Sequence, residues 1–135
     1  MAVSAQRDGL LPLTQKSLRF YDRTGYHDYE GLALDLDERR RIAASLGAHK
    51  ALILRNHGLL TVGASVTEAF TVMRGLEFAC QAHIAAQSGS APLVTPPPEV
   101  CEHTARQFEA NSDPGGREWP AFLRLLDRLD PSYAE

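Results

Sequence analysis

Short apolar runs and helical apolar stripes alternate along the 135-residue chain. Residues 51–54 form the run ALIL, which is too short for a helix, and the run LLTV follows at 59–62. Between the two runs lies the polar sequence RNHG, which ends in glycine. Two apolar runs joined by a tight polar turn predict neighbouring strands of one sheet.

The pattern downstream predicts a long helix from Val66 to about Gln87. Ser65 and Glu68 have the spacing of a capping box at its start. Apolar positions three and four residues apart predict a stripe packed on the sheet, made of Ala69, Phe70, Met73, Leu76, Cys80, His83 and Ile84. On that stripe we expect His83 to be buried and hydrogen-bonded.

Upstream of the two runs, glycine and proline recur too often over residues 10–34 for a helical period, so strands and turns are predicted there. A helix should then run to about Leu46, with Asp35 or Asp37 as its N-cap and Gly47 as its stop. Its buried stripe is predicted to consist of Leu36, Ile42, Ala43 and Leu46.

Prolines separate the last part of the chain from the rest. Pro92 and the run PPP at 96–98 predict a linker, since only Pro98 can open a helix. Helices are expected from Glu99 to about Asn111, and from Pro120 to just before Pro131. The second should carry one apolar side, formed by Trp119, Phe122, Leu123, Leu126 and Leu129. The fold class is therefore α/β followed by a helical tail, with residues 1–89 as the main part of one domain and residues 90–135 as its Pro-rich linker and C-terminal helices.

Composition narrows the classes of function. With 44% hydrophobic and 23% charged residues, the chain has the composition of an ordinary globular domain. A net charge of −3 supplies no basic field, which argues against a nucleic-acid partner. No apolar run approaches the roughly 20 residues that span a bilayer, so no membrane association is expected. Cys80 and Cys101 lack metal-site spacing and are interpreted as reduced packing residues of a cytoplasmic protein.

Two stretches could carry chemistry. His57 ends a strand and precedes a glycine that allows close backbone approach, so it is a candidate ligand or catalytic group. The alternative is a turn histidine that bonds to backbone. The stretch YHDYEG at 26–31 groups aromatic, imidazole and carboxylate side chains, which could suit a polar ligand or a subunit contact. Its alternative is an edge turn whose aromatic rings cover the core.

The sequence around His57 resembles the later half of the class II aldolase/adducin family, and the bacterial adducin-like members more than the sugar-phosphate aldolases. The similarity combines the NHG turn with a following helix of the EAF…LEFACQAH kind. It extends through AVSAQRDGLLPLTQKSLRFY and YHDYEGLALDLDERRRIAASLG upstream and VTPPPEV downstream. The resemblance implies part of a three-layer α/β/α sandwich with a largely antiparallel central sheet, and a homo-oligomer, commonly a cyclic tetramer.

The resemblance also implies a metal centre. Aldolase members hold a divalent metal, usually zinc, with an HxH pair and a later histidine, which His57 matches. The HxH pair is expected just upstream of the stretch aligned with Ala2, and this sequence begins at Met1. The family's acidic catalytic residue and phosphate-binding loops are expected further upstream. Catalytic zinc needs three protein ligands, so His57 alone is insufficient.

The remaining histidines are not expected to replace that pair, because they form no paired metal-binding motif with one another; they are His27, His49, His83 and His103. A tyrosine that donates a proton in the aldolases is also unmatched, since Gln15 or Lys16 stands at that place and Tyr21 lies several residues on.

Two functional hypotheses follow from the resemblance. The first is family-level, metal-dependent aldehyde-lyase (carbon–carbon bond) chemistry on a small carbonyl or hydroxy-acid substrate, incomplete or inactive in this amino-terminally truncated chain. The second is a non-catalytic oligomerisation or interaction module like the adducin head, which in eukaryotic relatives is associated with the actin cytoskeleton.

Overall fold

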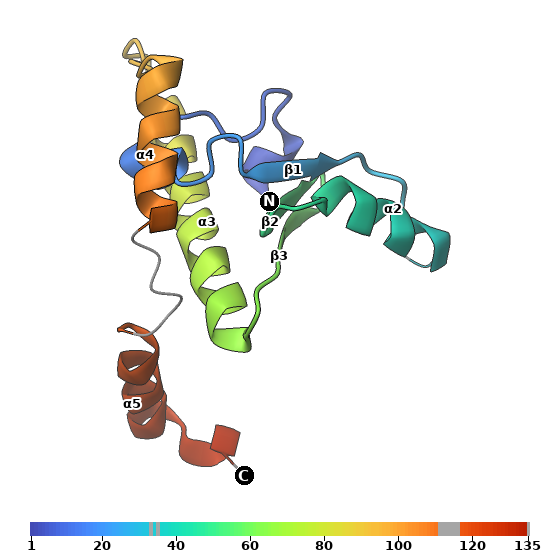
Figure 1. The fold of residues 1–135 in the computed structure, drawn as a ribbon, viewed down its shortest axis with the longest axis vertical. Helices are drawn as coiled ribbons and strands as arrows, with labels where there is room; N and C mark the ends of the chain where they lie inside the picture. Colours follow the sequence, from blue (N-terminus) through green and yellow to red (C-terminus); the bar gives the residue numbers. More distant parts are fainter. Residues whose placement is uncertain (33, 35, 111–116, 135) are drawn as a thin grey trace.

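The computed structural model describes residues 1–32, 34, 36–110 and 117–134. Helices and strands in those ranges follow one another as labelled in Figure 1. They are η1 (Ala2–Ala5), α1 (Gln15–Leu18), β1 (Thr24–His27), α2 (Leu36–Leu46), β2 (Ala51–Leu54), β3 (Gly58–Thr61), α3 (Val66–Gln87), α4 (Pro98–Ala110), α5 (Trp119–Leu129) and η2 (Pro131–Ala134).

The described strands form one sheet in the order β1-β2-β3. Strands β2 and β3 pair antiparallel, with Leu54 opposite Gly58, which confirms the predicted strand–turn–strand unit. Strand β1 runs parallel to β2, with Thr24 beside Ala51 and His27 beside Leu54. Helix α2 makes the connection that a parallel pair requires.

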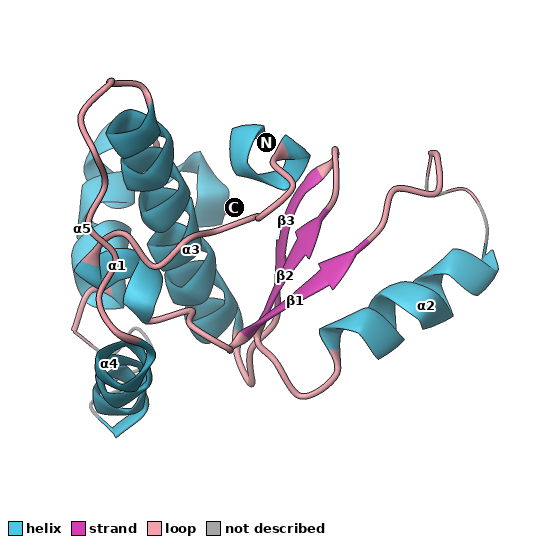
Figure 2. Cartoon of the chain, turned by 90° about the horizontal axis from the view of Figure 1, so that it is seen from above, coloured by secondary structure: helices cyan, strands magenta, loops and turns pink. Residues whose placement is uncertain are grey.

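Helices cover both faces of this sheet. All four residues of β2 are buried, as expected for a strand with a helix on each side. Figure 2 shows α2 on one side of the sheet and α3 on the other. The predicted α/β/α layering is therefore confirmed for the described residues, although only one of the two strand pairs is antiparallel.

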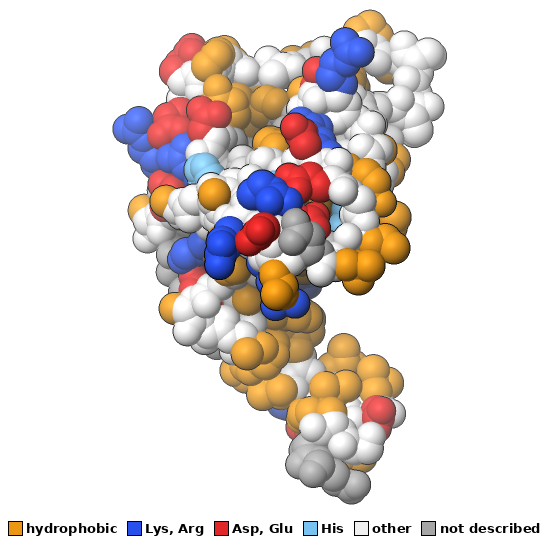
Figure 3. Space-filling view, turned by 90° about the vertical axis from the view of Figure 1, so that its right-hand side faces the viewer, with side chains coloured by type: hydrophobic (Ala, Val, Ile, Leu, Met, Phe, Trp, Pro, Cys, Tyr) orange, Lys and Arg blue, Asp and Glu red, His pale blue; other side chains and the backbone are white. Residues whose placement is uncertain are grey.

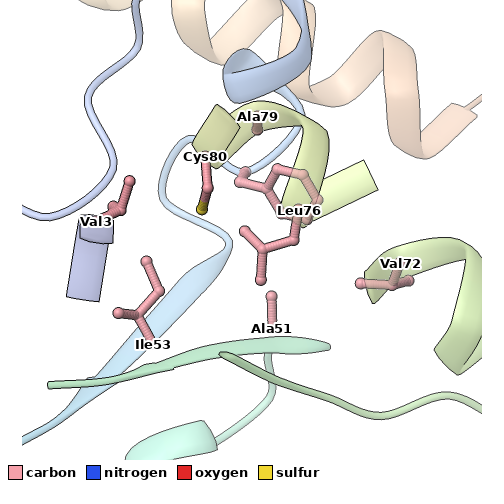
Figure 4. Packing of buried hydrophobic residues seen from close by; sticks show 8 residues of the cluster. Val3, Ala51, Ile53, Val72, Leu76, Ala79 and Cys80 are labelled. Carbon is pink, nitrogen blue, oxygen red and sulfur yellow. The ribbon is translucent and has the colours of Figure 1, made fainter. Parts of the chain in front are cut away.

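The main core lies between the sheet and α3 (Figure 4). Alternate residues of β2, Ala51 and Ile53, face Leu76 and Cys80 of α3, and Val3 of η1 closes one side. Leu76 and Ile53 are completely buried. Full burial of such side chains is worth about 1.5–3 kcal/mol each, so the contact between β2 and α3 is a main source of stability.

Helix α3 has its predicted bounds, but its buried face is rotated from the predicted stripe. The buried positions are Glu68, Val72, Leu76, Ala79, Cys80 and His83. Phe70 is exposed to 42% and contacts Trp119 and Phe122 of α5 by edge-to-face packing. The rotation arises because α3 packs against α1 as well as against the sheet.

The capping box at the start of α3 is only half formed. Ser65 Oγ accepts a hydrogen bond from the Glu68 N–H at 3.2 Å. The Glu68 carboxylate turns instead to the Ala64 N–H and to the Lys50 ammonium group. Both contacts favour the ionised carboxylate, with Lys50 the stronger, and they lower the pKa of Glu68.

Two predictions for residues 10–47 need correction. Residues 15–18 form a one-turn helix rather than a strand or turn, because Thr14 and Ser17 make a reciprocal capping box. Helix α2 begins at Leu36, so Asp37 lies in its first turn and is not the N-cap; Asp35, the other candidate, lies outside the described residues. Gly47 does stop the helix, with φ +56°.

The buried stripe predicted for α2 is also wrong in part. Leu36 is exposed to 67% and Ala43 is exposed, whereas the buried residue of this helix is Glu38. The packed face of α2 therefore includes a carboxylate that the predicted apolar stripe did not contain.

The helical tail is attached unequally. Helix α4 begins at Pro98 as predicted and is tied to the segment before β1 by Arg23, which pairs with Glu102 and Glu109. Helix α5 has no buried residue, and it lies at the far end of the molecule from the sheet (Figure 1). Of its predicted apolar side, Leu126 and Leu129 are exposed. Asn111, the predicted end of the helix that precedes α5, lies outside the described residues.

No described helix combines the length and the apolar character needed to cross a membrane.

The contact between α2 and β1 depends on the absence of a side chain at Gly25. A methyl group there would overlap the Ser45 carbonyl oxygen and lie 2.9 Å from Leu52 Cδ1. We therefore expect Gly25→Ala to lower the free energy of unfolding by about 1–3 kcal/mol, as overpacking does. Urea denaturation measures the effect, with Gly89→Ala as control, because the nearest atom there lies 4.0 Å away. Equal stability of the two variants would contradict this close approach.

Candidate functional site

His57 lies on the turn between β2 and β3, and its side chain is exposed. Asn56 adopts the left-handed conformation, with φ 56°, that turns the chain. The His57 N–H donates to the Leu54 carbonyl and the Asn56 N–H donates to the Ser4 carbonyl, both at 3.0 Å. The backbone of the turn is thus anchored to β2 and η1 while the imidazole remains available.

The described residues do not assemble a metal centre around His57. The group of potential ligands that the described residues bring together does not contain it. His83 is buried, as predicted, and is bonded through Nδ1 to the Leu11 N–H and through Nε2 to Gln6. His103 is exposed on α4. The three-histidine set implied by the resemblance therefore does not fit within the described residues.

A different cluster forms at the end of β1, from His27, Glu30 and Glu38. One ligand atom from each lies within 4.8 Å of the other two. His27 and Glu38 are exposed to only 7% and 6%. His27 Nε2 lies 3.7 Å from Glu30 Oε1, too far for a hydrogen bond, and has no hydrogen-bond partner.

The surrounding residues fix this cluster in place. His27 Nδ1 shares a hydrogen bond of 3.0 Å with Ser45 Oγ of α2. Arg41 holds the Glu30 carboxylate with Nε at 3.0 Å from Oε1 and 2.9 Å from Oε2. Since Glu38, Arg41 and Ser45 all come from α2, packing of that helix on β1 creates the cluster.

The stretch YHDYEG, singled out from the sequence for a polar ligand, contains His27 and Glu30 but not Glu38. As a metal ligand His27 was predicted only from pairing with other histidines, whereas the structure groups it with two glutamates. The available signals were the spacing of His27 and Glu30, three residues apart, and a glutamate at the inward position of a helix.

The aromatic residues of YHDYEG do not cover the core, so that interpretation is wrong. Tyr26 is exposed to 37% and Tyr29 to 55%. The Tyr26 hydroxyl accepts a hydrogen bond from the Leu10 N–H, and the Arg55 guanidinium lies 4.4 Å from the ring centre. His27 is the buried member of the stretch, whereas Asp28 and Glu30 are exposed.

A hollow of about 810 Å³ opens between α1, α3 and α4, and charged groups line it. Most of these charges are already paired, as in the contacts of Lys50 with Glu68, Arg23 with Glu109 and Arg74 with Glu118. Burial lowers the pKa of Arg19 from its usual value. Figure 3 shows the same mixing of signs over the face seen there, without a field of one sign. The hollow therefore favours no simple anionic or cationic ligand.

Both cysteines are free and buried, as predicted, with Cys80 exposed to 6% and Cys101 to 1%. Burial is the main cause that raises the pKa of both thiols, that of Cys80 to about 11. The thiolate is the reactive form, so neither residue is suited to be a nucleophile.

We expect both thiols to resist alkylation in the folded protein at pH 8, where a thiol of pKa 11 is only about 0.1% thiolate. In urea, where burial is lost, both should react at the rate of an exposed cysteine. A thiol reagent with mass-spectrometric detection measures this difference. Rapid native labelling of either cysteine would contradict the buried environment.

The sequence of the chain is similar to a family model and to proteins from bacteria and animals. Residues 1–84 match the family model described as the class II aldolase and adducin N-terminal domain. The whole chain is 47% identical to a Caulobacter vibrioides protein with a provisional aldolase class 2 name, covering 53% of it. Over 95% of its length the chain is 38% identical to mouse alpha-adducin, covering 19% of that protein. It thus spans about half the length of the bacterial relatives it matches.

Solved structures agree with this. An aldolase II superfamily protein from Pseudomonas syringae superimposes with a TM-score of 0.91 at 50% identity, over 99% of this chain and 55% of that one. An L-fuculose 1-phosphate aldolase from Glaciozyma antarctica gives 0.75 at 26% identity, over 97% of this chain and 49% of that one.

Proposed function

The chain belongs to the class II aldolase and adducin family, and from this premise we propose that it supplies part of a metal-dependent carbon–carbon lyase site. His57 would contribute one ligand, to zinc in preference to other divalent metals. The substrate would be a small carbonyl or hydroxy-acid compound. Similarity to a protein named as an L-fuculose 1-phosphate aldolase supports the reaction class.

The position of His57 carries this proposal. Its imidazole is exposed on a turn whose backbone is held from two sides, which suits a ligand that meets groups from outside the described residues. Met1 also lies close to this turn, since a side chain at Gly58 would point to within 4.0 Å of Met1 Cγ. A segment joined ahead of Met1 would therefore emerge beside His57.

The proposal makes this chain incomplete as a catalyst. Catalytic zinc is held by three protein ligands with a fourth position open to substrate, and the described residues supply His57 alone to the family site. The further ligands would come from another segment or another copy, so we propose that the active form is a homo-oligomer. Free buried thiols support a reducing compartment, and we propose the cytoplasm.

A fusion tests the role of His57. The upstream part of the Pseudomonas syringae relative, where the resemblance places the HxH pair, is joined ahead of Met1. We expect the fusion to hold one equivalent of zinc more than the 135-residue chain and to release an aldehyde from a hydroxy-acid or sugar-phosphate substrate. His57→Ala should remove that extra zinc and lower kcat/KM at least about 100-fold, because a metal ligand is lost. Mass spectrometry of metal content and a coupled aldehyde assay measure both effects.

The matched control is His103→Ala, which removes an exposed histidine on α4 and should change neither zinc content nor rate. Survival of the extra equivalent of zinc and of activity after His57→Ala in the folded fusion would overturn the assignment. Turnover by the 135-residue chain alone would overturn the proposed incompleteness.

A second function has its own support. Alpha-adducin is 38% identical over 95% of the chain, and the described residues do not complete the family's metal site. The chain could then act as a non-catalytic oligomerisation module of the adducin type. Exposed apolar side chains at Leu32, Leu34 and Leu36, with exposed fractions of 79%, 84% and 67%, provide surface for such contacts.

Sedimentation velocity separates the module from the lyase site. The module predicts one defined oligomer that is unchanged by a metal chelator, because apolar contacts and not metal hold it together. Leu36→Lys should shift the distribution towards monomer, whereas Val94→Lys, at a position exposed to 85% in the linker, should leave it unchanged. A monomer or a polydisperse aggregate of the unaltered chain would contradict the module.

A further inference from the structure

The cluster of His27, Glu30 and Glu38 has an unsatisfied polar atom at its centre. His27 is more than nine-tenths buried, yet its Nε2 has no hydrogen-bond partner. Buried polar atoms are nearly always satisfied, since leaving one unpaired costs free energy. The carboxylates of Glu30 and Glu38 are its polar neighbours in this group. The orphaned nitrogen therefore faces negative charge.

Neither tautomer of His27 satisfies Nε2. If Nδ1–H donates to Ser45 Oγ, then Nε2 presents a lone pair towards two carboxylates, and the three groups repel one another. If Ser45 donates instead, Nε2 carries a hydrogen that has no acceptor within bonding distance. Either way the space between the three side chains is suited to a positive charge.

We propose that His27 Nε2 and the carboxylates of Glu30 and Glu38 bind a divalent metal ion, with zinc as the ion of best fit. One imidazole and two carboxylates are a donor set that zinc accepts, at about 2.0–2.2 Å from each ligand atom. Two such atoms in a tetrahedral site lie about 3.4 Å apart. The 3.7 Å between His27 Nε2 and Glu30 Oε1 is close to that value.

Two neighbouring residues would position these ligands. Ser45 fixes the ring of His27 through Nδ1, as the outer partner of a metal-bound histidine commonly does. Arg41 orients the Glu30 carboxylate through both of its oxygens. The side chain of Glu30 is 33% exposed, so an ion could enter from solvent and keep a water molecule as its fourth ligand.

The charges facing the cluster leave room for a cation. Arg41 forms an ion pair with Glu30. Glu38, the buried residue of α2, makes no hydrogen bond or ion pair among the described residues. The Glu38 carboxylate is thus a second acidic group of the cluster, beside the Glu30–Arg41 ion pair. This site is separate from the turn that carries His57.

Zinc titration of the metal-stripped 135-residue chain tests the proposal by calorimetry and by thermal unfolding. We expect one equivalent of zinc per chain and a Tm that rises with zinc concentration, because the ion binds the folded state. Glu38→Gln keeps the shape of the side chain and removes its charge, and should weaken zinc binding at least ten-fold. His27→Gln should do the same, and circular dichroism checks that each variant is folded.

Controls separate this site from others on the chain. Glu99 lies in the first turn of α4, as Glu38 lies in the first turn of α2. The variant Glu99→Gln should therefore bind zinc as the unaltered chain does. His57→Ala should also keep the one equivalent of zinc. The outcome for the cluster therefore does not depend on whether His57 is a ligand of the family metal site. Absence of zinc binding, equal binding by Glu38→Gln and the unaltered chain, or loss only on His57→Ala would each overturn the proposal. A Tm that responds to pH but not to zinc would show that a proton serves there instead.

Discussion

Burial of strand β2 on both faces is the constraint on which the rest of the structure depends. Its residues Leu52 and Ile53 are fully buried, so a helix has to cover each side of the strand. Helix α3 covers the face of Ala51 and Ile53, and α2 packs on the other face through Gly25 and Leu52. Strands β1 and β3 both pair with β2. The position of β2 therefore sets the positions of both neighbouring strands.

That arrangement places the chemistry at one end of the sheet. His27 is the last residue of β1 and lies beside Leu54, the last residue of β2. The Arg55 N–H donates to the His27 carbonyl at 2.8 Å, and His57 follows two residues later. Side chains at paired positions of neighbouring strands share a face of the sheet. His27 therefore lies on the sheet face that α2 covers, and α2 carries Glu38 and Ser45. Polar groups from three elements meet where the strands end.

Local sequence patterns predicted the helices and strands well where a single local factor, such as a cap or an apolar run, decides the structure. The run ALIL is buried on both sides. Ser65 begins α3 and Gly47 ends α2, each by local geometry. The face that a helix buries depends on all its neighbours, and no local pattern contains them. Phe70 was expected inside but meets Trp119, which lies 49 residues later in the chain. Similarly, Glu38 is buried on α2, and the residues that it lies beside, His27 and Glu30, come from β1 and the loop after it.

The two candidate metal sites differ in what completes them. His57 is exposed and needs ligands from outside the described residues, so its affinity for metal depends on assembly or on additional chain. His27 and its two glutamates come from β1, the following loop and α2, and the fold itself brings them together. An ion there would join α2 to β1, in addition to the His27–Ser45 hydrogen bond and the close approach at Gly25. Metal at this cluster would therefore act on the stability of the α2 layer, whereas metal at His57 would act on chemistry. The same ion could thus have two separable effects on one chain, because His57 and the cluster share the end of a sheet but no ligand.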